Sequence, residues 1–202
     1  MIKNVVFDVG NVLVRWDPLA ITTRVFHDNP DPDQLMQRIF KSQTWYDLNL
    51  GYISEKDVIA RYKNDLGIDQ EKLEYLMQVV KESLTPIEGS FELLEKLYHA
   101  SIPLYALTDN THEIMAYLKE KYNFWGLFKG VVVSAEVGYL KPSKLIYEHL
   151  LNKYQLIAHE TLFIDDHMPN VEGAKAVDMQ ALVFKSVSKC IEDLQKLYQL
   201  TC

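Results

Sequence analysis

The sequence predicts an α/β protein with a doubly wound parallel sheet and a helical cap inserted after the first strand. Two observations predict this class. Short apolar runs of strand length recur along the 202 residues, and from about residue 87 onward they alternate with segments of helical periodicity. Such alternation is typical of a parallel sheet with helices on both faces. Residues 17–86 interrupt this order with helical patterns alone.

Five apolar runs have the length of strands. They cover residues 5–7, 104–107, 131–133, 162–164 and 181–184. Helical segments follow the later runs. Thr111 precedes HEIMAYLKEKY, and a hydroxyl at this position is a common helix start. Pro142 and Ser143 precede KLIYEHLLNKY, whose predicted buried side carries Leu145, Ile146, His149 and Leu150.

Residues 17–86 predict the helical cap, and residues 1–16 and 87–202 predict the α/β core. The cap segment contains no convincing strand but several amphipathic helices. In SEKDVIARYKNDLG, Ser54 and Asp57 have the spacing of a capping box. Ligands of open parallel sheets bind beyond the carboxyl ends of the strands. A segment that leaves and re-enters at that edge can therefore cover the site as a lid.

The composition excludes several kinds of partner. The formal net charge is −7 and the isoelectric point is near 5.4, so we expect no nucleic acid partner. No apolar run approaches the roughly 20 residues that cross a bilayer, and the N-terminal run is too short for a signal peptide. The two cysteines, Cys190 and Cys202, predict neither a zinc site nor a disulfide scaffold. We expect a cytoplasmic protein, either a monomer or a homodimer.

Polar residues follow four of the predicted strands. They are Asp8 after the first, Thr108, Asp109 and Asn110 after the second, Lys141 after the third, and Asp165 and Asp166 after the fourth. The carboxyl ends of parallel strands meet at one edge of a sheet, so we expect these side chains to converge there.

The chemistry of this set suits phosphoryl transfer. A carboxylate such as Asp8 can attack phosphorus and form an aspartyl-phosphate. An acidic pair offers the oxygen ligands that Mg²⁺ prefers. A hydroxyl and a lysine can bind the other phosphoryl oxygens, where charge lies in the transition state. We therefore expect Mg²⁺-dependent hydrolysis of a small phosphomonoester.

Four segments in order resemble the motifs of the haloacid dehalogenase-like hydrolase superfamily, most members of which are Mg²⁺-dependent phosphatases. They are FDVGNVLV, ALTDN, VGYLKPSKLIY and FIDDHMPNVEGA, and the resemblance covers nearly the whole chain. It implies a Rossmann-like sheet with a helical cap at residues 17–86. It also implies that Asp8 is the nucleophile and a metal ligand, that Thr108 and Lys141 bind phosphate, and that Asp166 binds Mg²⁺.

The resemblance implies further roles for neighbouring residues. The backbone carbonyl of Gly10 is expected to bind the metal. Asp165 is a further candidate metal ligand, and Asn170 lies nearby. Asn110 is a candidate for contact with the substrate, and Asn11 either holds the turn of its loop or contacts the ligand.

The sequence departs from the family pattern at Gly10, where these phosphatases usually have a second aspartate that serves as general acid and base. General acid–base catalysis is commonly worth about 10²–10⁴-fold, so its loss matters most for poor leaving groups. Three outcomes stay open: a replacement acid such as His112 or His167, a leaving group that needs little protonation, or a weak or silent enzyme. A subset with a similar Gly-Asn motif includes glucose-1-phosphate phosphatases, so a sugar phosphate is one expected substrate.

The predicted cap carries aromatic and basic residues that could contact the substrate. These candidates are Trp16, Arg24, Trp45 and Tyr46.

Two alternatives to a phosphatase stay open. In a metal-independent haloacid dehalogenase the aspartate attacks carbon, but the pair Asp165 and Asp166 argues against this activity because it needs no second acidic cluster. In a non-catalytic protein the same site would only bind a phosphate ligand, and Gly10 favours this alternative.

Overall fold

The computed structural model of the protein describes residues 1–199. Within that range, five parallel strands form one sheet in the order β3-β2-β1-β4-β5. The strands are β1 (Asn4–Phe7), β2 (Leu104–Thr108), β3 (Phe128–Val133), β4 (Thr161–Asp165) and β5 (Gln180–Val183). All five predicted strands and the doubly wound α/β class are confirmed. The largest difference in bounds is at β3, which begins three residues before the predicted run.

The central strand β1 shows why the strands contain unbroken apolar runs. It pairs with both β2 and β4, and Val5 is aligned with Leu104 on one side and Leu162 on the other. Val5 and Phe7 belong to one core cluster, whereas Val6 points to the opposite face and belongs to another. Both faces of the strand are therefore covered, and the three residues Val5, Val6 and Phe7 are fully buried and apolar.

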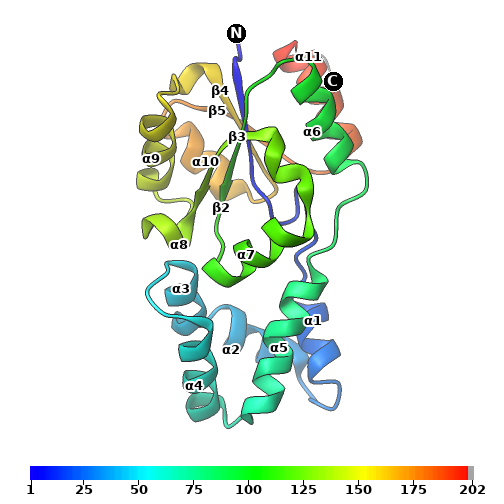
Figure 1. The fold of residues 1–202 in the computed structure, drawn as a ribbon, viewed down its shortest axis with the longest axis vertical. Helices are drawn as coiled ribbons and strands as arrows, with labels where there is room; N and C mark the ends of the chain where they lie inside the picture. Colours follow the sequence, from blue (N-terminus) through cyan, green and yellow to red (C-terminus); the bar gives the residue numbers. More distant parts are fainter. Residues whose placement is uncertain (200–202) are drawn as a thin grey trace.

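Helices cover both faces of the sheet (Figure 1). On the face of Val5 and Phe7 pack α6 (Ser90–His99), α7 (His112–Lys121) and α11 (Val187–Tyr198). On the other face pack α9 (Lys144–Tyr154) and α10 (Met168–Lys175). The short helix α8 (Ser134–Val137) and two 3₁₀ helices, η1 (Asn123–Leu127) and η2 (Ala158–Glu160), complete this part of the chain.

Helix α9 corrects one prediction. Ile146 and Leu150 are fully buried as expected, but Tyr147 is buried beside them and Leu145 is 42% exposed. The Tyr147 hydroxyl donates to the Asn170 carbonyl of α10 at 2.8 Å. Helical periodicity identifies the helix, but this contact with a distant segment decides which of two adjacent stripes faces inward.

Between residues 17 and 86 the regular elements are five α-helices. They are α1 (Pro18–Val25), α2 (Pro32–Phe40), α3 (Gln43–Asn49), α4 (Glu55–Leu66) and α5 (Gln70–Ser83). Each begins after an Asp or Ser whose side chain accepts a backbone N–H three residues on. The predicted capping box of Ser54 and Asp57 is confirmed.

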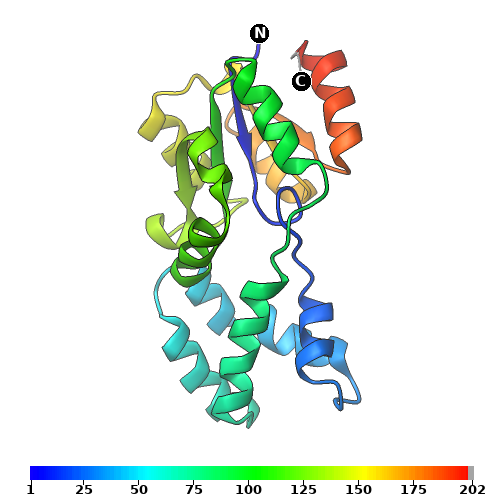
Figure 2. The same ribbon diagram turned by 45° about the vertical axis from the view of Figure 1, so that its right-hand side comes forward.

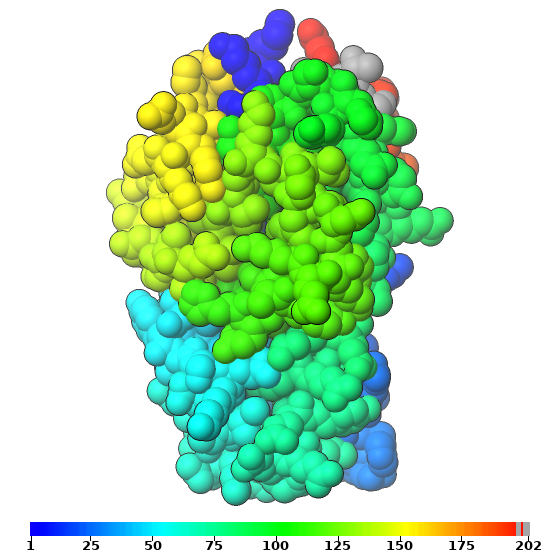
Figure 3. Space-filling model, in the orientation of Figure 1, coloured from blue at the N-terminus to red at the C-terminus, as the bar shows by residue number. Residues whose placement is uncertain are grey.

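The five-helix segment lies beyond the carboxyl ends of the strands (Figures 1 and 2). Two chain crossings, paired as a short antiparallel bridge, connect it to the sheet. The Arg15 N–H donates to the Thr85 carbonyl at 2.8 Å, and the Ile87 N–H donates to the Leu13 carbonyl at 2.9 Å. Helix α3 also contacts α8, and α5 contacts α7. Figure 3 shows the two parts in contact, with α3 and α4 in cyan beneath the green residues.

The structure also bears on the expectations for membrane spans and for the two cysteines. Among residues 1–199, no helix combines the length and apolar character of a membrane span. Cys190 is buried on α11, and Cys202 lies outside the described residues.

Candidate active site

Asp8 lies directly after β1, where the order of the strands reverses. The chain proceeds from β1 toward β2 and from β4 toward β5, so the carboxyl ends of β1 and β4 form the switch point of the sheet. The Asp8 N–H donates to the Ile164 carbonyl at 2.9 Å, which extends the pairing past the strand. Asp8 is 7% exposed, and its Oδ1 lies 2.7 Å from Lys141 Nζ.

The loop after Asp8 reverses direction within a few residues. The N–H groups of Leu13 and Val14 both donate to the Val9 carbonyl, at 2.9 and 3.0 Å. Asn11 has a φ of +53°, a left-handed conformation that asparagine tolerates better than most residues. Its Oδ1 accepts the Trp16 N–H at 2.9 Å. Asn11 therefore holds the turn, one of its two expected roles, and its contact with a ligand stays a prediction.

Lys141 reaches the site from the loop after α8 and is buried among carboxylates. Its Nζ lies 2.7 Å from Asp8 Oδ1 and 2.8 Å from Asp165 Oδ2, and its N–H donates to Asp109 Oδ1 at 3.1 Å. Burial by itself lowers the pKa of the ammonium, but the charges of these three carboxylates outweigh burial and raise the pKa of Lys141. The lysine is therefore a fixed positive charge at the edge of the sheet.

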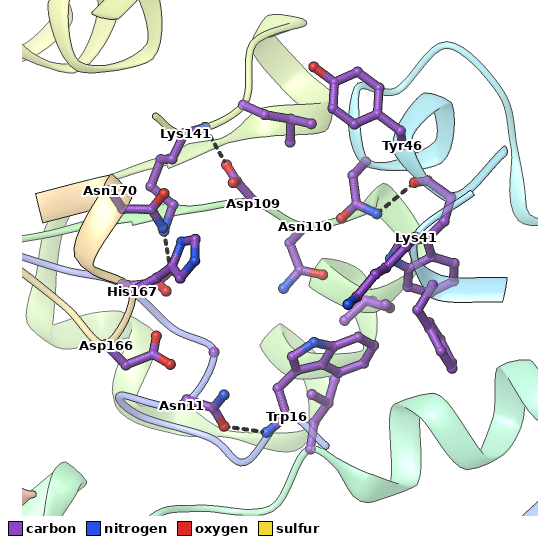
Figure 4. A pocket seen from close by; sticks show the side chains of 18 of the residues that line it. Asn11, Trp16, Lys41, Tyr46, Asp109, Asn110, Lys141, Asp166, His167 and Asn170 are labelled. Carbon is purple, nitrogen blue, oxygen red and sulfur yellow. Dashed lines mark hydrogen bonds and ion pairs between the residues drawn. The ribbon is translucent and has the colours of Figure 1, made fainter. Parts of the chain in front are cut away.

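The acidic pair at the end of β4 divides into a buried and an exposed member. Asp165 is fully buried and accepts hydrogen bonds from Lys141 Nζ at 2.8 Å, from Asn170 Nδ2 at 3.0 and 3.1 Å, and from the His167 N–H at 2.8 Å. Asp166 is exposed, and its carboxylate points into the cavity (Figure 4). Asp165 thus positions its neighbours, whereas Asp166 is open to a ligand.

Asp8, Asp165 and Asp166 form an acidic cluster in which one oxygen of each residue lies within 4.8 Å of the others. Burial raises the pKa of Asp8 to about 8; the Lys141 charge opposes this rise and the Asp165 charge adds to it. Burial also raises the pKa of Asp109 to about 6. One lysine does not balance these carboxylates. A hard divalent cation with oxygen ligands fits this donor set and would restore the ionised form of Asp8.

The sheet edge and the helical segment enclose a cavity of about 470 Å³ (Figure 4). The sheet edge contributes Asp8, Asp109, Asn110, Lys141, Asp166 and His167. The helical segment contributes Phe40, Lys41, Ser42, Trp45, Tyr46 and Asn49. A ligand in this cavity would therefore contact the acidic cluster on one side and helices α2 and α3 on the other.

The structure brings most of the predicted site residues to the cavity. Those that line it are Asp8, Gly10, Asn11, Asn110, Lys141 and Asp166. Two predicted residues do not line it. Asp165 is fully buried beside Lys141, and Thr108, the last residue of β2, is 1% exposed. Phosphate binding by Thr108 and metal binding by Asp165 stay predictions.

Three of the four aromatic and basic residues predicted to contact the substrate lie at the cavity. Trp16, Trp45 and Tyr46 line the cavity. Arg24 does not, because its guanidinium pairs with Glu82 of α5 at 2.9 Å at the surface.

Only one of the two histidines considered as replacement acids lies at the cavity. His167 lines the cavity, whereas His112 is exposed at the start of α7 and does not. His167 is therefore the histidine in position to exchange a proton with a bound ligand.

Sequence reasoning assigned no role to Asp109, Phe40 and Lys41, which also line the cavity. Asp109 directly follows β2 and was among the strand-end residues expected to converge, but no role was assigned to it. Phe40 and Lys41 stand at the end of α2, and no local signal shows that this helix end faces the sheet. Their position depends on how the five helices pack.

Comparison with known proteins identifies the family. The haloacid dehalogenase-like hydrolase family matches residues 19–184. The sesquiterpene phosphatase astK of Aspergillus oryzae is 29% identical over 191 residues, 94% of each chain. The D-ribitol-5-phosphate phosphatase of Bacteroides thetaiotaomicron is 24% identical over 195 residues, 89% of this chain and 90% of that protein. A haloacid dehalogenase-like enzyme of Bacteroides thetaiotaomicron, solved with magnesium and inorganic phosphate, aligns with a TM-score of 0.74 at 17% identity, over 92% of this chain and 96% of that chain. The chain belongs to the haloacid dehalogenase-like hydrolase family.

Proposed function

We propose that the protein hydrolyses a small phosphomonoester in the presence of Mg²⁺, through an aspartyl-phosphate on Asp8. The observation that carries the proposal is the convergence of Asp8, Lys141 and Asp166 from separate strand ends on one cavity. A nucleophile, a fixed cation and an open carboxylate that lie close together are the parts that phosphoryl transfer requires.

Asp8 is the proposed nucleophile. One carboxylate oxygen forms a bond to phosphorus while the bond from phosphorus to the ester oxygen breaks, and the departing alkoxide takes a proton. Water then attacks phosphorus of the aspartyl-phosphate, which releases inorganic phosphate and restores the carboxylate. Two displacements thus replace one difficult hydrolysis.

Lys141 and the acidic cluster supply positive charge for the phosphoryl group. The ammonium is held against Asp8 and Asp165, so it does not reorganise when charge develops on the phosphoryl oxygens. Asp8, Asp166 and the Gly10 carbonyl would hold Mg²⁺, and within residues 1–199 this carbonyl accepts no backbone hydrogen bond. When bound, Mg²⁺ neutralises charge on the transferred group.

Gly10 leaves the departing oxygen without a carboxylic acid. The proton comes from water or from His167, which lines the cavity. Esters with good leaving groups are therefore expected to react fastest.

The relatives support the reaction class but not one substrate. One acts on a sesquiterpene and another on D-ribitol-5-phosphate, and a structural neighbour was solved with magnesium and inorganic phosphate. Their organic groups differ, so these names leave the organic group open. In this proposal residues 17–86 act as the cap that contacts it, and residues 1–16 and 87–202 carry the phosphoryl chemistry.

The acidic cluster favours the phosphatase over both alternatives. A metal-independent dehalogenase has no use for Asp166, a carboxylate that is open to the cavity next to the nucleophile. A protein that only binds phosphate gains nothing from Asp8, because the negative charge of this carboxylate repels the phosphate.

The test is hydrolysis of acetyl phosphate, a sugar phosphate and an alkyl phosphate with and without Mg²⁺. We expect Asp8→Asn and EDTA each to abolish phosphate release. Asp178→Asn, the same change at an exposed aspartate outside the cavity, is expected to keep full activity. Phosphate release that survives EDTA would contradict the requirement for Mg²⁺, and Asp8-dependent halide release from a 2-haloacid in EDTA would favour the dehalogenase. No Asp8-dependent release from any ester in a single-turnover assay would favour the binding protein.

A further inference from the structure

We infer that the organic group of the substrate is apolar, so that the cavity accepts the phosphate ester of a hydrophobic alcohol or phenol in preference to a sugar phosphate. This inference rests on the proposed phosphatase function and adds the substrate class to it.

Three aromatic rings form one wall of the cavity, and we call Trp16, Phe40 and Trp45 the aromatic wall. The Trp16 and Trp45 rings are stacked, with centroids 6.1 Å apart and planes at 11°. Phe40 meets both edge-on, at 5.4 Å from Trp16 and 4.8 Å from Trp45. The rings hold one another in place, so the wall offers a preorganised apolar surface to a ligand.

Aliphatic side chains from other segments continue this surface. Val14 and Leu84 come from the two connections to the helical segment, Ile114 from α7, and Leu140 from the loop before Lys141. These residues come from several separate segments, so they are not simply the core-facing side of one helix. Apolar side chains from both parts of the molecule instead face the same space.

Three of the neutral polar side chains that line the cavity already form hydrogen bonds within the protein. Ser42 Oγ donates to a main-chain carbonyl of α2 at 2.8 Å. Asn49 Nδ2 donates to the Trp45 carbonyl at 2.8 Å, and Asn110 Oδ1 accepts the N–H of the α7 cap at 3.0 Å. A sugar loses its hydrogen bonds to water on entering a site, and polar groups that are already bonded within the protein do not replace them.

Charged and apolar groups lie at different ends of the cavity. Figure 4 shows Lys141, Asp166, His167 and Asn170 at one end and Trp16 facing them across the space. The exception is Lys41, whose side chain enters from α2 and forms no ion pair within residues 1–199. A second ammonium adds attraction for a doubly charged phosphate without offering a site for several hydroxyls.

The size of the cavity fits this substrate class. A volume of about 470 Å³ lies within the roughly 300–1,000 Å³ typical of sites for small organic ligands. Inorganic phosphate or acetyl phosphate would leave much of that space, including the aromatic wall, without contact.

The experiment compares n-octyl phosphate with D-ribitol-5-phosphate. Both are esters of primary alcohols, so the leaving groups are alike and the comparison reports on the organic group. Each methylene removed from water is worth about fourfold in affinity, so we expect kcat/KM to favour octyl phosphate by about 100-fold or more.

A matched pair of variants locates the effect. Phe40→Gln places an amide in the aromatic wall and is expected to lower the ratio of octyl phosphate to acetyl phosphate activity about tenfold. Phe26→Gln makes the same change in a half-buried ring of the helical segment that does not line the cavity, and this ratio is expected to stay unchanged.

The outcomes separate this inference from the proposed function. Asp8-dependent hydrolysis of acetyl phosphate with equal or higher activity on ribitol phosphate would overturn the inference and leave the phosphatase in place. If no ester is hydrolysed, the phosphatase proposal fails, and calorimetry with octylphosphonate and methylphosphonate still tests the cavity. Tighter binding of octylphosphonate, weakened by Phe40→Gln, supports an apolar site, and equal binding of the two phosphonates overturns it.

Discussion

The buried ammonium of Lys141 lies 2.7 Å from Asp8 and 2.8 Å from Asp165, and the lysine is 7% exposed. Removal of one partner from a buried ion pair costs about 3–5 kcal/mol, because the other charge is left without compensation. We therefore expect Lys141→Met to lower the free energy of unfolding by about this amount in urea denaturation. Lys144→Met, at an exposed position three residues on, is expected to change it by less than about 0.5 kcal/mol. Equal stability of the two variants would contradict this account of Lys141.

Gly10 has room for the acid that it lacks. A Cβ added there would meet only Trp16 Cβ at 3.9 Å, an ordinary contact. We expect Gly10→Asp to raise kcat for an alkyl phosphate by about 10²-fold or more, because a carboxylic acid can then protonate the leaving oxygen. The effect on acetyl phosphate is expected to be much smaller, since its leaving group needs no proton.

Gly10→Asn is the control for this change, because it adds the same volume without an acid. A similar gain in both variants would show that the effect is one of shape and not of proton transfer.

At the scale of single residues, the position after a strand was the informative signal. It predicted Asp8, Asn110, Lys141 and Asp166, which all line the cavity. It could not show that Thr108 is 1% exposed, because the burial of a side chain at a strand end depends on the segments packed over it. Phosphate binding by Thr108 therefore stays a prediction.

At the scale of elements, Tyr62 joins α4 to α2. It is 1% exposed, and its hydroxyl donates to the Ile39 carbonyl at 2.7 Å. Burial raises the pKa of Tyr62 to about 12 from an ordinary value of 10.0, although a hydrogen bond with Ser42 opposes the rise. The folded state thus favours the neutral hydroxyl. The resulting stability is fully present below pH 10 and is lost as the pH rises from about 10 to 12.

We therefore expect the wild type to lose about 2–3 kcal/mol of stability to this group in that pH interval. Tyr62→Phe is expected to lack this part of the alkaline loss, and at neutral pH to be about 1 kcal/mol less stable because a hydrogen bond is missing. Tyr52→Phe, at a residue that is 67% exposed, serves as the control. Denaturation by urea at several pH values measures both effects, and a Tyr62→Phe profile parallel to the wild type would contradict the assignment.

The elements differ in how well their sequences predict them. The strands are recognisable because both faces of the sheet are covered, so each contains a short unbroken apolar run such as residues 162–164. The prediction of which side of α9 faces the core was wrong in part. The contact of Tyr147 with the Asn170 carbonyl, which turns this side inward, joins residues 23 positions apart in the sequence. Local periodicity contains no information about such a contact.

At the scale of the whole molecule, metal binding is expected to stabilise the fold. A ligand that binds only the folded state adds about 2.7 kcal/mol at a concentration 100 times its Kd. We expect Mg²⁺ to raise the Tm of the chelator-treated protein, and Asp166→Asn to reduce this increase. Asp178→Asn is expected to respond to Mg²⁺ as the wild type does. A Tm that is independent of Mg²⁺ at millimolar concentration would argue against the metal site.

Asn11 joins the two ends of the cavity. Its Oδ1 accepts the backbone N–H of Trp16, whose ring belongs to the aromatic wall, and the same side chain favours the ionised form of Asp166 and so opposes the rise in the pKa of that carboxyl. We therefore expect a ligand that shifts the Trp16 backbone to shift this amide as well, and so to change the surroundings of the carboxylate beside the nucleophile. Binding of the organic group could then affect the acidic end of the cavity through one side chain, without movement of the whole helical segment.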